Sequence, residues 1–192
     1  MKKSLIVVGC LMVCMVCTPA FAQEDYAPFE VFGGYNFTRF DGDLNMNGWG
    51  AAFTYNLNPT FGINVDIGGA YKSESASEGG VSLNAKTNIL SFMAGPQAGV
   101  KLNDFAKVFG HALFGFTHLN TSMDISAGRN NMDLFDESTN GFSMAFGGGI
   151  DWQIANNIAI RAPQFDYIPV KFEGGWSNNT RLLVGIVFQL GK

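Results

Sequence analysis

Apolar and polar residues alternate along most of this chain with a period of two. In the stretch FGINVDIGGAY, residues 61 to 71, most odd-numbered residues are large and apolar, whereas the even-numbered ones are small or polar. Because successive side chains of a β-strand point to opposite faces of a sheet, this pattern predicts a strand that lies between two different environments. The stretch raises a question, because a carboxylate, Asp66, lies in the middle of it.

The same alternation recurs eight times. Most of the segments are close to the roughly 9 to 11 residues that a tilted strand needs to cross a bilayer, and an even number of strands is the rule for bacterial single-chain barrels. Pro163 interrupts the seventh segment and predicts a β-bulge there, because proline cannot donate to a ladder. The predicted strands are 29–37, 49–57, 61–71, 89–100, 108–118, 142–154, 158–172 and 181–190.

The predicted connections alternate in length. Short turns follow the second, fourth and sixth strands, and longer polar loops follow the others. This arrangement is typical of outer membrane barrels, which have short periplasmic turns, long outer loops and both termini on the periplasmic side. The predicted long loops are 40–48, 72–86, 119–140 and 173–180.

The volume of the side chains indicates which face points inward. An eight-stranded barrel has an interior just wide enough for side chains, which suits the glycine, alanine and polar face. The opposite face would form an apolar belt too large for a soluble monomer. The predicted fold is therefore all-β, an eight-stranded antiparallel up-and-down transmembrane β-barrel. A secreted lipocalin-like binder, with the apolar face lining a cavity, is the weaker alternative.

The N-terminal segment predicts export. Lys2 and Lys3 precede an uncharged stretch, and residues 20–22 supply the small residues of a signal peptidase site, so we expect a signal peptide at 1–22 and a barrel domain at 23–192. A lipoprotein signal ending at Cys10 is a competing interpretation, which would leave a very short apolar segment.

Cleavage after Ala22 changes the composition of the exported chain. The three cysteines, Cys10, Cys14 and Cys17, all lie in the signal peptide, so disulfides, thiolate nucleophiles and cysteine metal sites are excluded from the mature protein. The loss of Lys2 and Lys3 leaves 10 basic and 16 acidic residues, a net charge of −6, which argues against nucleic-acid binding.

Together, the signal peptide, the eight alternating segments and the final stretch RLLVGIVFQLGK resemble the small outer-membrane β-barrel proteins of the OmpA and OmpX type. That last stretch resembles the terminal signal read by the barrel-assembly machinery, with Gly185, Phe188 and Leu190 at matching spacing, although the chain continues to Gly191 and Lys192. The resemblance implies residence in the outer membrane of a diderm bacterium, among lipid and lipopolysaccharide.

Several charged and polar residues fall on the predicted inner face. Charges in a narrow, dry lumen must be paired or hydrogen-bonded, so we expect a polar network that fills and fixes the barrel. Asp66 is expected to pair with an arginine, either Arg161 or Arg181. The predicted network consists of Glu30, Asp66, Asp151, Arg161, Gln164, Asp166 and Arg181.

Other candidate sites favour structural interpretations. His111 and His118 lack a nearby nucleophile and are interpreted as a lumen and a rim residue. The acidic segment from Asp124 to Glu137 matches no calcium-loop spacing and favours a solvated, mobile loop. We therefore expect no catalytic residue, cofactor or metal site.

The sequence favours an envelope structural or surface-interaction role, adhesion-like in kind, through the outer loops. Phe135 and Trp176 are the exposed loop aromatics that would contact a partner. A narrow porin-like channel for small solutes or ions is the alternative, although eight strands leave little open space. A lipid-modifying barrel enzyme is a third and weaker one.

Overall fold

The computed structural model describes residues 26–40, 44–78, 81–127 and 130–191. The expected signal peptide and its cleavage site after Ala22 lie outside these residues. Within the described part of the chain, no helix is long and apolar enough to cross a membrane.

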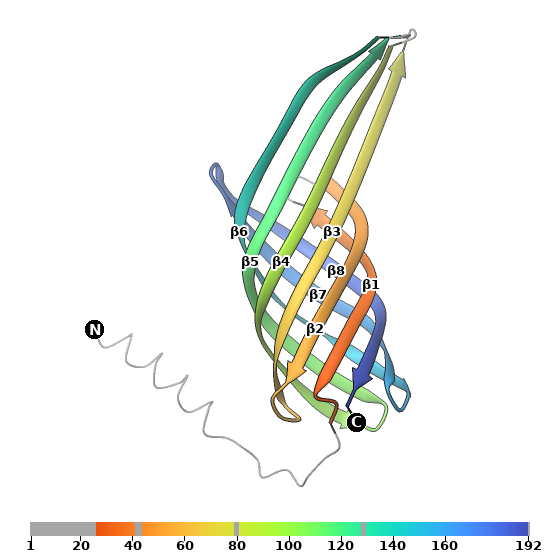
Figure 1. Ribbon diagram of the computed structural model, residues 1–192, viewed down its shortest axis with the longest axis vertical. Coiled ribbons are helices and arrows are strands. Elements are labelled where there is room, and N and C mark those ends of the chain that lie inside the picture. The colour runs from red at the N-terminus through yellow and green to blue at the C-terminus, as the bar shows by residue number, and fades with distance from the viewer. Residues whose placement is uncertain (1–25, 41–43, 79–80, 128–129, 192) are drawn as a thin grey trace, which may run out of the picture.

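Eight antiparallel strands follow one another around a closed barrel, and β1 pairs with β8 to complete the ring (Figure 1). This confirms the predicted fold class. The register of β7 shifts between Arg161 and Gln164, which confirms the bulge predicted at Pro163. The strands are β1 (Phe29–Phe40), β2 (Leu44–Asn56), β3 (Phe61–Glu78), β4 (Val81–Asn103), β5 (Ala106–Ala127), β6 (Asn130–Ala155), β7 (Ile158–Phe172) and β8 (Gly175–Leu190).

The long loops predicted at 72–86 and 119–140 are wrong, because both segments belong to strands. The β3–β4 ladder continues to the pair Glu78↔Val81, and the β5–β6 ladder continues to Ala127↔Asn130. Most of the loops predicted at 40–48 and 173–180 are also strand. These segments lack a clear apolar face because water meets more of their surface, so the alternation is weak although the ladder continues. The two ends of the barrel therefore differ mainly in how far the strands extend beyond the ring, and less in the length of the loops.

The extended strands form a four-stranded sheet that rises beyond the rest of the barrel (Figure 1). The β2–β3 ladder ends at Asn47↔Tyr71, and the β6–β7 ladder ends at Phe142↔Lys171, whereas β3 to β6 remain paired with one another. We call this part of the molecule the projecting sheet, residues 72–78, 81–87, 121–127 and 130–141. The acidic segment predicted to be a mobile loop lies within it, and Ser122 pairs there with Asp136.

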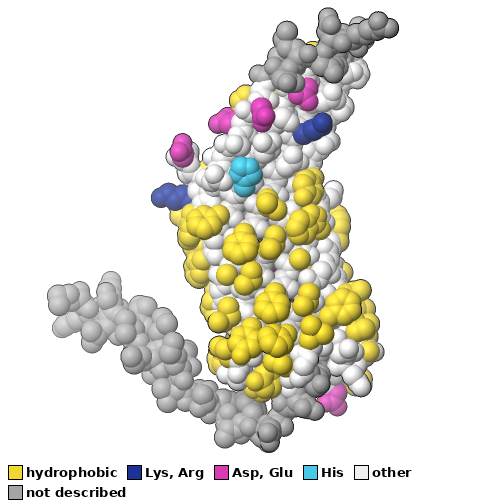
Figure 2. All heavy atoms as spheres, in the orientation of Figure 1, with side chains coloured by type: hydrophobic (Ala, Val, Ile, Leu, Met, Phe, Trp, Pro, Cys, Tyr) yellow, Lys and Arg dark blue, Asp and Glu magenta, His cyan; other side chains and the backbone are white. Residues whose placement is uncertain are grey.

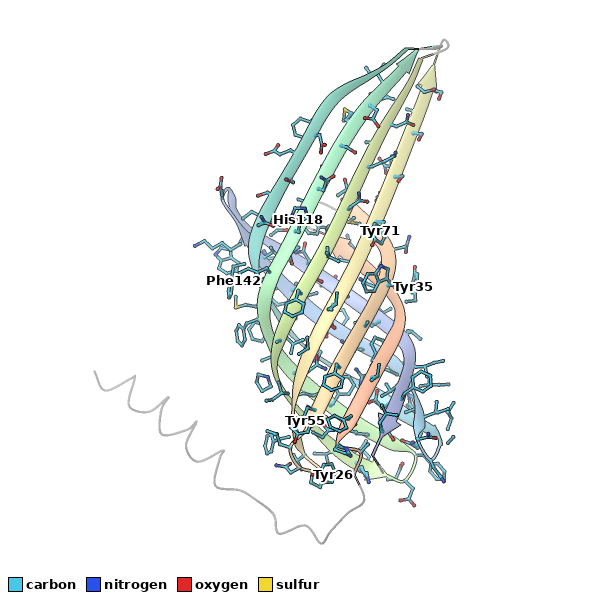
Figure 3. All side chains as sticks on the ribbon, in the orientation of Figure 1. Tyr26, Tyr35, Tyr55, Tyr71, His118 and Phe142 are labelled. Carbon is cyan, nitrogen blue, oxygen red and sulfur yellow. The ribbon has the colours of Figure 1, made fainter. Side chains whose placement is uncertain are left out.

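The outer face below the projecting sheet is an apolar band (Figure 2). Tyr35 and Tyr71 lie near its upper border and Tyr55 near the opposite end (Figure 3). The Trp49 indole donates to the Tyr71 hydroxyl at 3.1 Å, whereas Phe29 stacks on Tyr55 with ring centroids 5.3 Å apart. Aromatic girdles of this kind mark the two membrane interfaces.

The spacing of the girdles fits a bilayer. Phe61 and Tyr71 are ten residues apart on β3. At about 3.3 Å per residue and a tilt of about 40°, these ten residues span about 25 Å of membrane thickness. That value matches the height of the apolar band in outer membrane barrels.

Two glycines allow β1 and β8 to approach closely at the seam that closes the ring. A Cβ atom on Gly185 would lie 2.2 Å from the Gly33 carbonyl oxygen and 2.8 Å from the Phe32 ring. A Cβ atom on Gly34 would lie 2.3 Å from the Val184 carbonyl oxygen. The seam therefore has no room for side chains at these two positions.

We expect Gly185→Val to weaken the barrel by about 1–3 kcal/mol, the usual consequence of overpacking a filled interior. Urea unfolding of protein refolded in lipid vesicles, without any assembly machinery, measures this change. Gly33→Val is the matched control, because a Cβ atom there meets nothing within 4 Å. Equal stability of the two variants would contradict the packing role of Gly185.

Candidate functional site

The seven polar residues predicted to lie in the lumen are all buried. None of them is more than 3% exposed. Their positions follow from strand parity, except that the bulge at Pro163 brings both Arg161 and Gln164 to the inner face. The barrel wall therefore directs the charged groups away from lipid and toward one another.

Arg181 on β8 is the partner of Asp66. Its Nη1 donates to Asp66 Oδ1 at 2.8 Å, across the lumen from β3, and its Nη2 donates to Asp166 Oδ2 on β7 at 2.7 Å. Of the two arginines proposed as partners of Asp66, the structure selects Arg181. One guanidinium thus joins three strands, and two of them are neighbours that pair at Asp166↔Arg181.

Arg161 forms a second ion pair nearer the end of the barrel where β7 begins. Its Nε and Nη2 donate to the two oxygens of Asp151 at 2.7 and 2.9 Å, the bidentate geometry that suits guanidinium and carboxylate. The guanidinium carbon lies 4.1 Å from the centre of the Phe109 ring. The face of an aromatic ring attracts a cation, so this contact also stabilises Arg161. Gln164 accepts from Arg161 and donates to Asp166, so it links the two ion pairs.

Two residues outside the predicted set also belong to this network. Lys107 Nζ contacts Glu30 Oε1 at 2.6 Å, and His111 Nε2 lies 2.9 Å from Asp166 Oδ1. The alternation predicts that the fifth strand begins at Val108, whereas β5 begins at Ala106 and includes Lys107. The alternation, continued one residue earlier, would have placed Lys107 on the inner face with Phe109 and His111.

The two histidines do not form one site. His111 lies in the lumen, whereas His118 is exposed on the outer surface, where its Nδ1 lies 2.8 Å from Asn140 Oδ1. Seven residues separate them along one strand, and an odd separation puts two side chains on opposite faces. Among the described residues, no group of three or more histidine, cysteine or acidic side chains is arranged to hold a metal ion.

The remaining predicted residues lie apart from the network. Phe135 is exposed on the projecting sheet, whereas Trp176 is exposed on β8 near the β7–β8 turn, with Lys171 Nζ 5.8 Å from the centre of its ring. Phe188 and Leu190 face outward and are exposed. The structure therefore separates the loop aromatics from each other and from the lumen.

The family model of the outer membrane protein beta-barrel domain matches residues 8–188. The chain belongs to this family. Membership places this barrel in the outer membrane, with its apolar band in lipid and its charged network inside.

Solved structures show the same fold in other members of this architecture. The barrel is similar to Ail, the attachment invasion locus protein of Yersinia pestis, with 19% identity, 85% of this chain and 100% of that chain covered, and a TM-score of 0.57. It is also similar to Neisserial surface protein A, with 13% identity, coverage of 87% and 100%, and a TM-score of 0.54. A search of curated proteins finds no match.

Removal of the Arg181 side chain should destabilise this barrel strongly. We expect Arg181→Met to lower the free energy of unfolding by about 3–5 kcal/mol, because Asp66 and Asp166 are left buried without their cation. Urea unfolding in lipid vesicles measures the loss.

Lys72→Met is the control, because the Lys72–Glu74 pair is also short, at 2.9 Å, but lies at the surface. We expect that change to stay within about 1 kcal/mol, the usual range for exposed pairs. Similar losses in the two variants would contradict a structural role for the buried pair.

Proposed function

We propose that this outer membrane barrel is a surface-interaction protein that contacts its partners through the projecting sheet. The observation that carries the proposal is the continuation of β3 to β6 beyond the barrel rim. From Tyr71 to the last residue of β3 there are seven residues. At about 3.3 Å per residue they carry the sheet roughly 20 Å further along the strand direction.

The projecting sheet ends in two unpaired edges. Residues 72–78 of β3 and 130–141 of β6 pair on one side only within the described ladders. Free edges present backbone N–H and C=O groups, which an extended segment of another protein can join by strand addition. Soluble proteins usually protect such edges, so two free edges above a membrane favour a binding role.

The charges of the sheet indicate the kind of partner. Its described acidic side chains are Glu74, Asp124, Asp136 and Glu137, whereas its described basic ones are Lys72 and Lys86. Asp136 and Glu137 both lie on the β6 edge. An acidic edge favours a basic, extended protein segment, because opposite charges raise the rate of encounter and set the register.

The relatives support a surface role but not the same ligand. Ail is named for attachment and invasion, and one of its structures contains the heparin analogue sucrose octasulfate. A sulfated, strongly anionic ligand does not suit the acidic projecting sheet. The polar ladder on this sheet, including the Ser75–Asn84 hydrogen bond of 2.7 Å, suits an aqueous surface that meets protein.

Shortening of the projecting sheet tests the proposal. In one variant, 73–86 and 121–137 are each replaced by a two-residue turn that joins the pairs Lys72↔Thr87 and Asn120↔Ser138. We expect bacteria that display this variant to adhere to cultured epithelial cells and immobilised basic proteins no better than cells without the barrel. Heat-modifiable migration on an unboiled gel checks that the barrel has folded.

Charge reversal on one edge at a time distinguishes the contributions of the two edges to adhesion. Asp136→Lys combined with Glu137→Lys should reduce adhesion to basic proteins, and Glu74→Lys on the opposite edge is the matched control. Full adhesion by the shortened, correctly folded and displayed variant would contradict the proposal.

We also propose that the exported form begins at Gln23, is inserted by the barrel-assembly machinery and is surrounded by lipopolysaccharide in the outer leaflet. The outward positions of Phe188 and Leu190 on the last strand support recognition of that strand during insertion. Mass spectrometry of the purified outer membrane protein should give the mass of residues 23–192. A lipid-modified mass beginning at Cys10 would contradict it.

A further inference from the structure

The polarity of the side chains that line the lumen changes along the barrel axis, and the outer part of the lumen is mostly apolar. At the periplasmic mouth, a cavity of about 120 Å³ is lined mainly by polar side chains that include Glu30, Lys107 and Gln189. The ion pairs of Arg161 and Arg181 lie in the middle, beside the buried apolar side chains of Phe32 and Leu183. The polar plug expected from the sequence corresponds to these two layers but not to the third.

A second, smaller cavity lies next to Arg181. It measures about 30 Å³ and is bordered by Asn36, Ser91 and Thr117 at the level of the network. A cavity needs at least about 10–15 Å³ to hold a water molecule, and that water needs polar partners. The cavity therefore has room and partners for about two water molecules.

Arg181 is the only charged side chain among the described residues that line this cavity. Two further polar side chains on its wall, Thr38 and Asn179, donate hydrogen bonds within the barrel, to Asn36 Oδ1 and to the Ile168 carbonyl oxygen. Otherwise its outer walls are apolar on both sides, with Ala70 and Ile89 on one wall and Ile168 and Val170 on the other. Met46 is fully buried against Ala70 and Ile89. Phe40 packs on this cluster, and its ring lies 6.4 Å from that of Phe172, which packs on the opposite wall. We call Phe40, Met46, Ala70, Ile89, Ile168 and Val170 the apolar cap.

The register places the apolar cap near the outer membrane interface. Ile89 pairs with Ala70, the residue directly before Tyr71, and Tyr71 receives the hydrogen bond from Trp49 of the upper girdle. Water that enters from the periplasm thus meets polar groups as far as Arg181 and then an apolar constriction. A hydrophobic constriction excludes water and ions because they cannot keep their hydration within it.

We propose that the apolar cap, and not the ion-pair network, is the permeability seal of this barrel. Ion pairs attract water and offer it hydrogen-bond partners, so a network alone separates the two compartments poorly. The cap offers water few such partners over the last part of the path. This assignment is independent of the role of the projecting sheet.

Conductance in planar lipid bilayers tests the seal. We expect the double variant Ile89→Ala, Val170→Ala to open at least about tenfold more often than the natural protein, because the constriction widens and admits water. Met46→Gln keeps nearly the same volume and adds an amide, so it should raise conductance by wetting the cap. Heat-modifiable migration verifies that each variant is folded.

Two control variants test whether a rise in conductance is specific to changes in the apolar cap. Leu90→Ala combined with Val184→Ala removes apolar atoms from the exposed, lipid-facing surface and should leave the barrel closed. Asp66→Asn weakens the network without touching the cap and should also leave it closed. Folded cap variants that stay as closed as the natural protein would overturn the proposal, and so would opening by Asp66→Asn to the level of the cap variants.

Discussion

A lumen too narrow for bulk water, enclosed by only eight strands, is the constraint on which the rest of this structure depends. Any charge that points into it must find a partner inside the barrel, because burial of an unpaired charge is costly. Arg181 meets this requirement with contacts to Asp66 and Asp166, and Arg161 with contacts to Asp151. The Arg181–Asp66 contact connects strands that are distant in sequence, whereas the contacts to Asp166 and Asp151 join neighbouring strands, so together they help to fix the shape of the ring.

The narrow lumen also determines which residues form the outer surface. Small and polar residues fill much of the lumen, so the large apolar residues at every second position of a strand must face outward. Lipid is the solvent that accepts this face. Above the upper girdle the outer face of the same strands becomes polar, as the Ser77–Ser82 and His118–Asn140 contacts show. One ladder thus passes from lipid into water without a break, and only its side chains change.

The alternation predicted the barrel and most of the lumen residues, but it failed where the two faces of a strand meet similar surroundings. Residues 72–78 are serine, alanine, lysine and glutamate, a composition that is also typical of loops, and only pairing with residues 81–87 reveals a strand. The alternation places the start of the fifth strand at Val108, two residues after β5 begins at Ala106, and so excludes Lys107. Met46 was missed because it lies in a segment predicted as a loop.

The sequence by itself determined the architecture and the orientation of its faces, because both depend on a local period of two and on side-chain volume. It placed Asp66 on the inner face but left Arg161 and Arg181 as equal candidates. Only the tertiary structure decided between them, because the height of β8 relative to β3 depends on the stagger of all the strands around the ring. The apolar cap arises in the same way, since its two walls come from strands that meet only across the closed barrel.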